Sequence, residues 1–158
     1  MGGISLMDIV DKISTVLAAD AALIAWADAK YDTTVTILVG MDERNRPGPE
    51  ACPLILIRPE RQDLSQSAAE QTHRVQVDWA VFDDTVTTTG TVTEYTGVRR
   101  VDEMGRLIWA ALQSGISSHV AMDQSEYVLE TIEKFPLLLG GMDITINVPQ
   151  LIGADITL

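Results

Sequence analysis

The sequence THRVQVDWAVFDDTVTTTGTVTEYTGVRRVDEMGRLIWAALQS, residues 72–114, decides the fold. It opens with apolar residues that alternate with polar ones, which predicts a strand over 73–82. It closes with apolar residues at helical spacing, which predict a helix over 99–114 that Gly115 ends. A threonine-rich segment with few large apolar residues lies between them. These features predict a strand and a helix that pack together, joined by a segment that the core does not need.

The two faces of the predicted strand differ in character. One face carries an unbroken apolar row made of Val75, Val77, Trp79 and Val81. The other face is mixed and is expected to hold His73, Gln76, Asp78, Ala80 and Phe82. Because successive side chains of a strand point to opposite faces, we expect the apolar row to pack on a helix. The mixed row is expected to face water or a neighbouring subunit.

The threonine-rich segment, 85–97, favours a protruding β-hairpin, with an irregular loop as the alternative. Gly90 stands at its middle, and Val86, Val92 and Tyr95 would supply cross-strand packing. A two-stranded hairpin on its own is marginal in water, so this hairpin is expected to lie on a partner.

The N-terminal half is expected to alternate helix, strand and loop. Apolar residues at spacings of three and four predict helix over 5–30, with a kink at Asp20 and with Ser5 or Asp8 as its cap. Strands are expected over 33–39 and 53–58, and Pro59 should end the second because proline cannot donate to a ladder. Between these strands, GMDERNRPGPEACP predicts a long loop. The segment ERQDLSQSAAEQ reads as a polar connector, either a surface loop or half a helical turn.

The C-terminal part predicts two strands around a turn at 138–141, with Pro149 closing the second strand. A short helix over 125–134 is the alternative for the first strand. The tail QLIGADITL is apolar and needs cover from its own body or from a neighbour's sheet edge. No repeat or linker divides the chain, so residues 1–158 are expected to form a single α+β domain. We expect a mixed, mainly antiparallel sheet of about five strands packed against two main helices.

Composition narrows the class of protein. The chain has 158 residues, of which 46% are hydrophobic, and this is ordinary for a globular protein. The formal net charge of −12 argues against a general binder of nucleic-acid backbones, which needs clustered Lys and Arg. A single cysteine, Cys52, excludes an intramolecular disulfide and fits a reducing cytoplasm. The N-terminus lacks a signal-peptide pattern and no apolar run reaches the roughly 20 residues of a membrane span, so we expect no membrane partner.

The candidate chemical groups do not form a catalytic set in the sequence. His73 and His119 lie in different elements, without metal-ligand spacing. Asp83 and Asp84, at a strand end, are the pattern of an acid–base pair or a cation site, but turn formation is the commoner role of such residues. Cys52 precedes Pro53 and indicates a core thiol rather than a nucleophile. We therefore expect no catalytic residue, no cofactor and no metal.

Three segments resemble the tail-terminator, or tail-completion, proteins of long-tailed phages and related prophages. They are the broken helix MDIVDKISTVLAADAALIAW, the strand HRVQVDWAVFDD followed after an insert by VDEMGRLIWAAL, and the closing hairpin FPLLLGGMDITINVP. The threonine-rich insert and the GMDERNRPGPEACP loop are longer than the family pattern.

The resemblance implies a structural protein that is not an enzyme. Such proteins form a ring, usually of six copies, that caps the tail tube, stops its growth and offers a surface to the head connector. The implied partners are other copies of the chain, the tail-tube protein and a head connector or neck protein, with DNA only passing through the channel. The implied location is the tail or neck of a virion that is assembled in the host cytoplasm.

The interface residues are a hypothesis at this point, built from the loop, the hairpin and the apolar tail. They are Asp42, Glu43, Arg44, Arg46, Glu50, Asp83, Asp84, Thr88, Glu94, Tyr95, Ile156 and Leu158. Two alternatives stay open. One is another neck protein, such as a head-completion or connector subunit. The other is a small α+β enzyme or ligand-binding domain that uses Asp83, Asp84 and His73.

Overall fold

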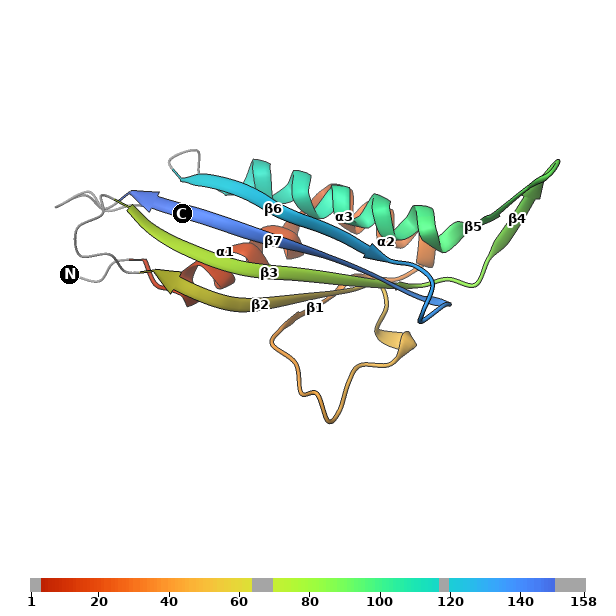
Figure 1. The fold of residues 1–158 in the computed structure, drawn as a ribbon, viewed down its shortest axis with the longest axis horizontal. Coiled ribbons are helices and arrows are strands. Elements are labelled where there is room, and N and C mark those ends of the chain that lie inside the picture. Colours follow the sequence, from red (N-terminus) through yellow and green to blue (C-terminus); the bar gives the residue numbers. More distant parts are fainter. Residues whose placement is uncertain (1–3, 64–69, 117–119, 150–158) are drawn as a thin grey trace.

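The computed structural model describes residues 4–63, 70–116 and 120–149. The elements follow the predicted order, and the α+β class is confirmed (Figure 1). They are α1 (Leu6–Ala19), α2 (Ala21–Tyr31), β1 (Thr36–Val39), the short 3-10 helix η1 (Pro49–Ala51), β2 (Leu54–Asp63), β3 (Glu70–Phe82), β4 (Val86–Thr89), β5 (Val92–Tyr95), α3 (Thr96–Gly115), β6 (Ala121–Glu130) and β7 (Leu137–Pro149). No helix of the described ranges is long and apolar enough to cross a membrane.

Five strands form one sheet in the order β1-β2-β3-β7-β6. β1 runs parallel to β2 and the other neighbouring pairs are antiparallel, so the sheet is mixed and mainly antiparallel, as predicted. The central pair, β3 and β7, is in register from Glu70 opposite Pro149 to Phe82 opposite Leu137. β4 and β5 form a separate two-stranded sheet.

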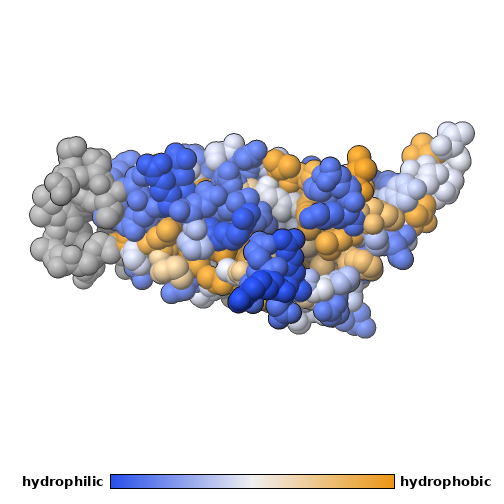
Figure 2. Space-filling model, turned by 60° about the horizontal axis from the view of Figure 1, so that its bottom comes forward, coloured by the Kyte–Doolittle hydropathy of each residue, from blue (hydrophilic) through white to orange (hydrophobic). Residues whose placement is uncertain are grey.

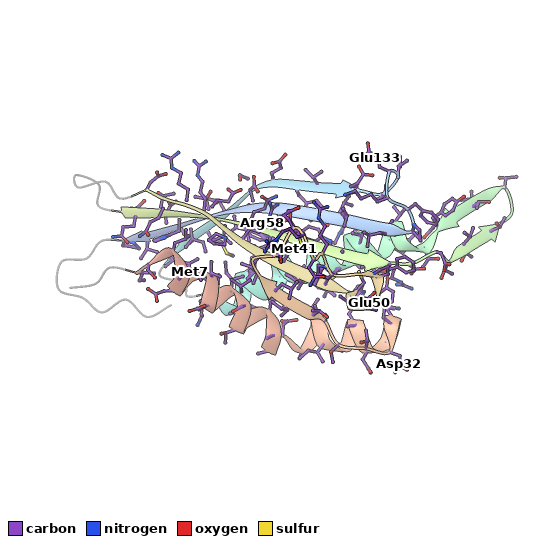
Figure 3. All side chains as sticks on the ribbon, turned by 90° about the horizontal axis from the view of Figure 1, so that it is seen from below. Met7, Asp32, Met41, Glu50, Arg58 and Glu133 are labelled. Atoms are coloured by element: carbon purple, nitrogen blue, oxygen red, sulfur yellow. The ribbon has the colours of Figure 1, made fainter. Side chains whose placement is uncertain are left out.

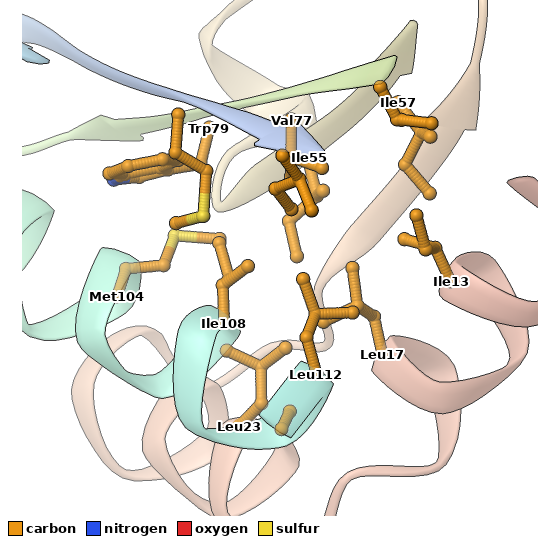
Figure 4. Close-up of a cluster of buried hydrophobic side chains, with 14 of the residues drawn as sticks. Ile13, Leu17, Leu23, Ile55, Ile57, Val77, Trp79, Met104, Ile108 and Leu112 are labelled. Carbon is orange, nitrogen blue, oxygen red and sulfur yellow. The ribbon is translucent and has the colours of Figure 1, made fainter. Parts of the chain in front are cut away.

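The core fills the space between one face of the sheet and the helices α1, α2 and α3 (Figure 4). Val75, Val77, Trp79 and Val81 are all buried on this face, which confirms the predicted apolar row of β3. They meet an apolar stripe of α3 and the inner residues of α1, which include Ile13, Leu17, Met104, Ile108 and Leu112. Each fully buried side chain of this size contributes roughly 1.5–3 kcal/mol relative to its exposed state.

The two N-terminal helices meet at the predicted kink, and each begins at a side-chain cap. Ser5 and Asp8 form a capping box, in which the Asp8 amide donates to Ser5 Oγ and the Ser5 amide donates to Asp8 Oδ2. Asp20 ends α1 and starts α2, and its Oδ1 accepts from the Leu23 amide at 2.8 Å. Trp26 of α2 is buried, and its indole N–H donates to Glu103 of α3 at 3.0 Å.

Trp79 is the point of closest approach between α3 and the sheet. A Cβ placed on Gly105 of α3 would lie 2.4 Å from the Trp79 ring, and one placed on Gly140 of β7 would lie 2.2 Å from it. The indole Nε1–H donates to the Val101 carbonyl of α3 at 2.7 Å. The absence of a side chain at Gly105 thus allows a close helix–sheet approach, and Gly140 makes the same allowance from the strand side.

Several predicted boundaries are wrong. β1 starts at Thr36 rather than at 33, and β3 starts at Glu70 rather than at 73. Pro59 does not end β2, which continues to Asp63 through a bulge between Pro59 and Arg61. A bulge interrupts the regular ladder, so the missing proline N–H is tolerated there. Both ends of the expected polar connector, 60–63 and 70–71, are therefore strand, while 64–69 lie outside the described residues.

The C-terminal turn was also misplaced. It spans 131–136, where the Glu130 carboxylate accepts from the amides of Ile132 and Glu133, and 138–141 lie inside β7. The alternative helix over 125–134 is wrong, because β6 extends to Glu130. α3 starts at Thr96, directly after β5, rather than at 99, and it ends at Gly115, the predicted stop, where a Cβ would lie 2.4 Å from Val16.

Candidate functional site

The sheet face opposite the helices is covered only in part, by the loop between β1 and β2 (Figures 1 and 3). Beside this loop lies a cleft of about 470 Å³. Its floor is made of side chains that alternate with the core residues on the central strands: Leu54, Leu56, Ala80, Leu137 and Leu139. Met41, Pro47 and Pro49 line it from the loop side. The cleft is therefore mainly apolar, and Figure 2 shows apolar surface next to the charged loop.

Charged residues surround the apolar floor of the cleft. The lining includes the cations Arg46, Arg58 and Lys134 and the acids Glu43 and Asp78. Arg58 of β2 pairs with Asp78 of β3, at 2.6 Å from Nη2 to Oδ2, and lies near Met41 (Figure 3). Arg46 pairs with Glu43 in the same way, so Lys134 is the one cation of the described lining in excess of its acids, in a chain whose net charge is −12.

The threonine-rich segment is a hairpin, as predicted, and the irregular-loop alternative is wrong. We call Val86–Tyr95 the arm. It extends beyond the end of the main sheet, and Gly90 takes the left-handed conformation at its tip (φ 62°) (Figure 1). The predicted cross-strand packing is partly confirmed: Val86 lies opposite Tyr95, but Val92 lies opposite Thr89. Thr88 and Thr93 face each other with their hydroxyls 3.1 Å apart.

The base of the arm is fixed to the body by three contacts. The Thr96 amide donates to the Thr85 carbonyl at 2.9 Å. The Tyr95 ring meets Phe135 of the β6–β7 turn edge-on, with centroids 5.3 Å apart. Both Glu94 oxygens accept from Arg99, at 2.8 and 2.9 Å, and this hydrogen bonding lowers the pKa of Glu94. The base is thus held in place while the tip is exposed.

The predicted interface residues of the loop form local ion pairs. Arg44 pairs with Asp42, whose pKa is lowered chiefly by this hydrogen bond, and Arg46 pairs with Glu43. Glu50 is exposed on the short helix η1. Exposed pairs of this kind contribute little to stability. Their role at an interface stays a prediction. Ile156 and Leu158, predicted for the same interface, lie outside the described residues.

Asp83, Asp84 and His73 do not converge on one site. Asp83 shapes a turn, since its Oδ1 accepts from the Thr85 amide at 2.9 Å, and its Oδ2 accepts from the Tyr31 hydroxyl at 3.4 Å. Burial raises the pKa of Tyr31, and the negative charge of Asp83 raises it further. Asp84 is exposed. His73 lies ten residues before Asp83 on an extended strand, which is roughly 33 Å at 3.3 Å per residue.

Cys52 lies in the cleft lining and is half-buried. Burial raises the pKa of its thiol to about 11, with a smaller contribution from Glu50. The thiolate, which is the nucleophilic form, is therefore scarce at neutral pH. In the described ranges, no three His, Cys, Asp or Glu residues gather into a group that could hold a metal ion. His119 lies outside these ranges.

His73 was assigned to the wrong face of β3. It is fully buried on the same face as Val75, because β3 runs regularly through this position and places His73 opposite Ile146. Neither ring nitrogen has a hydrogen-bond partner among the described residues. Burial lowers the pKa of His73 below 6.5, and the nearby charge of Asp8 only partly opposes this.

We expect the free energy of unfolding to fall as the pH drops below about 6.5, because of His73. In the unfolded chain this histidine has its ordinary pKa near 6.5 and takes up a proton that the folded chain resists. The folded state is thus favoured above pH 6.5 and loses stability toward the lower, folded pKa. Urea unfolding of the parent and of His73→Phe, at several pH values between 7.5 and 5, measures this. The free energy of unfolding should change less steeply with pH in His73→Phe than in the parent. Equal pH dependence in the two proteins would contradict the role of His73.

The cleft and its charged lining could not be predicted from the sequence. One signal was present: PLILIR is apolar at both parities, which indicates a strand covered on both faces. Two facts depend on tertiary structure. The 40–53 loop covers part of this second face, and Lys134, from the distant β6–β7 turn, joins the lining of the cleft.

No protein-family model matches this chain, and no curated protein matches it either. Among solved structures, a match is a chain from a structure described as "Virion of native gene transfer agent (GTA) particle". The two chains are 14% identical, and the match covers 87% of this chain and 91% of that chain with a TM-score of 0.47. At this level of likeness, the match does not define what this chain binds.

Proposed function

We propose that this chain is a structural subunit of a phage-like particle, and that it acts as a tail terminator. In this proposal the whole chain is one α+β domain, several copies form a ring on the end of the tail tube, and the ring presents a surface to the head. The observation that carries the proposal is the arm. Its Val86, Val92 and Tyr95 are 48%, 64% and 48% exposed on a hairpin that extends beyond the sheet.

The kind of contact that such an arm would make supports a ring. The arm and the partly covered sheet face are different surfaces of one molecule. Contacts between two different surfaces are heterologous, and they close into rings when the rotation between copies allows it. The net charge of −12 agrees with a channel through which DNA passes without adhering. The segment order agrees with the tail-terminator resemblance of the sequence.

The test is assembly of the purified chain, alone and with a tail-tube protein from the same genome. Native mass spectrometry and negative-stain microscopy should find closed rings, usually of six copies, or rings seated on one end of the tubes. Tube elongation should stop in their presence. A chain that stays monomeric at high concentration and neither binds tube ends nor limits tube length would exclude this function.

A further inference from the structure

The two faces of the arm differ, and one of them is suited to an apolar pocket with a cationic border. In the hairpin register Val86 pairs with Tyr95, and this face includes the ring that meets Phe135 of the same chain. The opposite face pairs Thr89 with Val92 and Thr87 with Glu94. It presents Val92, the most exposed of the three apolar side chains of the arm, beside the carboxylate of Glu94. We call this second face the outer face.

The cleft of the sheet has the complementary properties. Its floor is apolar, and in its described lining Arg46 and Arg58 are paired with the acids Glu43 and Asp78, which leaves Lys134 as a cation in excess. A volume of about 470 Å³ is enough for several side chains. The arm contains one acid, Glu94, and no Lys or Arg. Glu94 already binds Arg99, but a carboxylate has about four acceptor positions, so it can accept from a second cation.

We infer that the outer face of one copy's arm seats in the cleft of the next copy. Val92 then contacts the apolar floor, and Glu94 approaches the cationic border. This inference deepens the proposed function, on which it rests, by naming the two surfaces that join neighbouring ring subunits.

Two observations favour a second copy of this chain as the molecule that binds in the cleft: the charge of the cleft lining and the direction of the arm. Copies with a net charge of −12 repel one another over most of their surface, so association favours the place where cations exceed acids. The arm points away from the body that carries it (Figure 1), and seven of the eight residues of β4 and β5 are exposed. An isolated two-stranded hairpin is only marginally stable in water, so binding to a neighbouring copy would also stabilise the arm.

Disulfide trapping between two single-cysteine proteins tests the contact directly. In a Cys52→Ser background, one protein carries Val92→Cys on the arm and the other carries Met41→Cys in the cleft lining. The control partner carries Met7→Cys on α1, where Met7 is 47% exposed against 36% for Met41. Equal mixtures are oxidised and their mixed dimers are identified by mass. We expect about tenfold more mixed dimer with Met41→Cys than with Met7→Cys, since docking raises the effective concentration of the two thiols.

An arm substitution gives a second, independent measurement. Val92→Asp places a charge on the surface that should be buried, whereas Ile24→Asp places one on the 46% exposed Ile24 of α2. Both sites are on the surface, so both variants should fold, and circular dichroism checks this. We expect Val92→Asp to remove assemblies and Ile24→Asp to keep them.

The outcomes separate this inference from the proposed function. If rings form without a preferred disulfide between positions 92 and 41, or if rings still form with Val92→Asp, the arm-to-cleft contact is wrong and the ring itself is retained. Preferential trapping without closed rings or tube capping supports the arm-to-cleft contact and removes the tail-terminator function. Equal trapping with both partners and no assembly removes both.

Discussion

Replacing Trp79 with alanine should lower the free energy of unfolding by about 3–5 kcal/mol, the usual cost of deleting a buried aromatic side chain. Trp79 is 1% exposed and is the largest fully buried side chain of the described residues. It also donates to the Val101 carbonyl and packs against Tyr127 of β6. Its removal opens a cavity where α3, β3 and β7 meet, and glycines on both sides offer no side chains to fill it.

Two further tryptophan variants show whether this loss of stability is specific to the position of Trp79. Trp79→Phe keeps an aromatic ring but loses the N–H donor and some volume, so we expect a smaller loss of about 1–2 kcal/mol. Trp109→Ala removes the same side chain from a half-buried position on α3 and should cost less than Trp79→Ala. Urea unfolding followed by far-ultraviolet circular dichroism measures all three. Equal losses at Trp79 and Trp109 would contradict the proposed role of Trp79.

Replacing Gly140 with alanine should destabilise the fold by about 1–3 kcal/mol, the usual cost of overpacking. The added Cβ would lie 2.2 Å from the Trp79 ring, which the helix prevents from moving away. The matched control is its neighbour Gly141, whose side chain position lies on the opposite face. There a Cβ meets only the end of the Asp78 side chain, at 2.8 Å, and this carboxylate can shift. Gly141→Ala should be neutral or slightly stabilising, because alanine costs less backbone entropy in a strand.

A double-mutant cycle shows whether the clash with Trp79 is the cause. In a Trp79→Leu background the smaller side chain leaves room for a methyl group, so Gly140→Ala should cost less than in the parent. An unchanged cost would mean that Gly140 is required for another reason. For a chain of this length, each kcal/mol corresponds to a change in Tm of about 2–4 °C.

The parts of the fold that follow from local periodicity were predictable. The apolar row of β3, the stripe of α3 and the break at Asp20 need no knowledge of distant residues, and all three are present. The arm was predictable for a similar reason, since threonines on both sides of Gly90 favour a hairpin and add little to a core.

The errors arose where tertiary structure overrides a local signal. Pro59 is a terminator by its chemistry, but a bulge lets β2 continue past it. Gly140 and Gly141 indicate a turn, but in β7 the first of them makes room for Trp79. The cleft forms only when the β1–β2 loop, the three neighbouring strands β2, β3 and β7, and the β6–β7 turn are brought together. Adjacent residues do not carry that information, so the candidate site was only half predictable.

The strand order has a consequence for biosynthesis. β7, the last of the described strands along the chain, occupies the position between β3 and β6. Until Leu137–Pro149 leave the ribosome, β3 has an unpaired edge and β6 has no neighbour in the sheet. The arm is synthesised well before that point. Partly made chains therefore carry both a bare strand edge and an adhesive hairpin, a combination that favours wrong pairing in crowded polysomes. Pairing of β7 with β3 and β6 is the step that covers the bare strand edge.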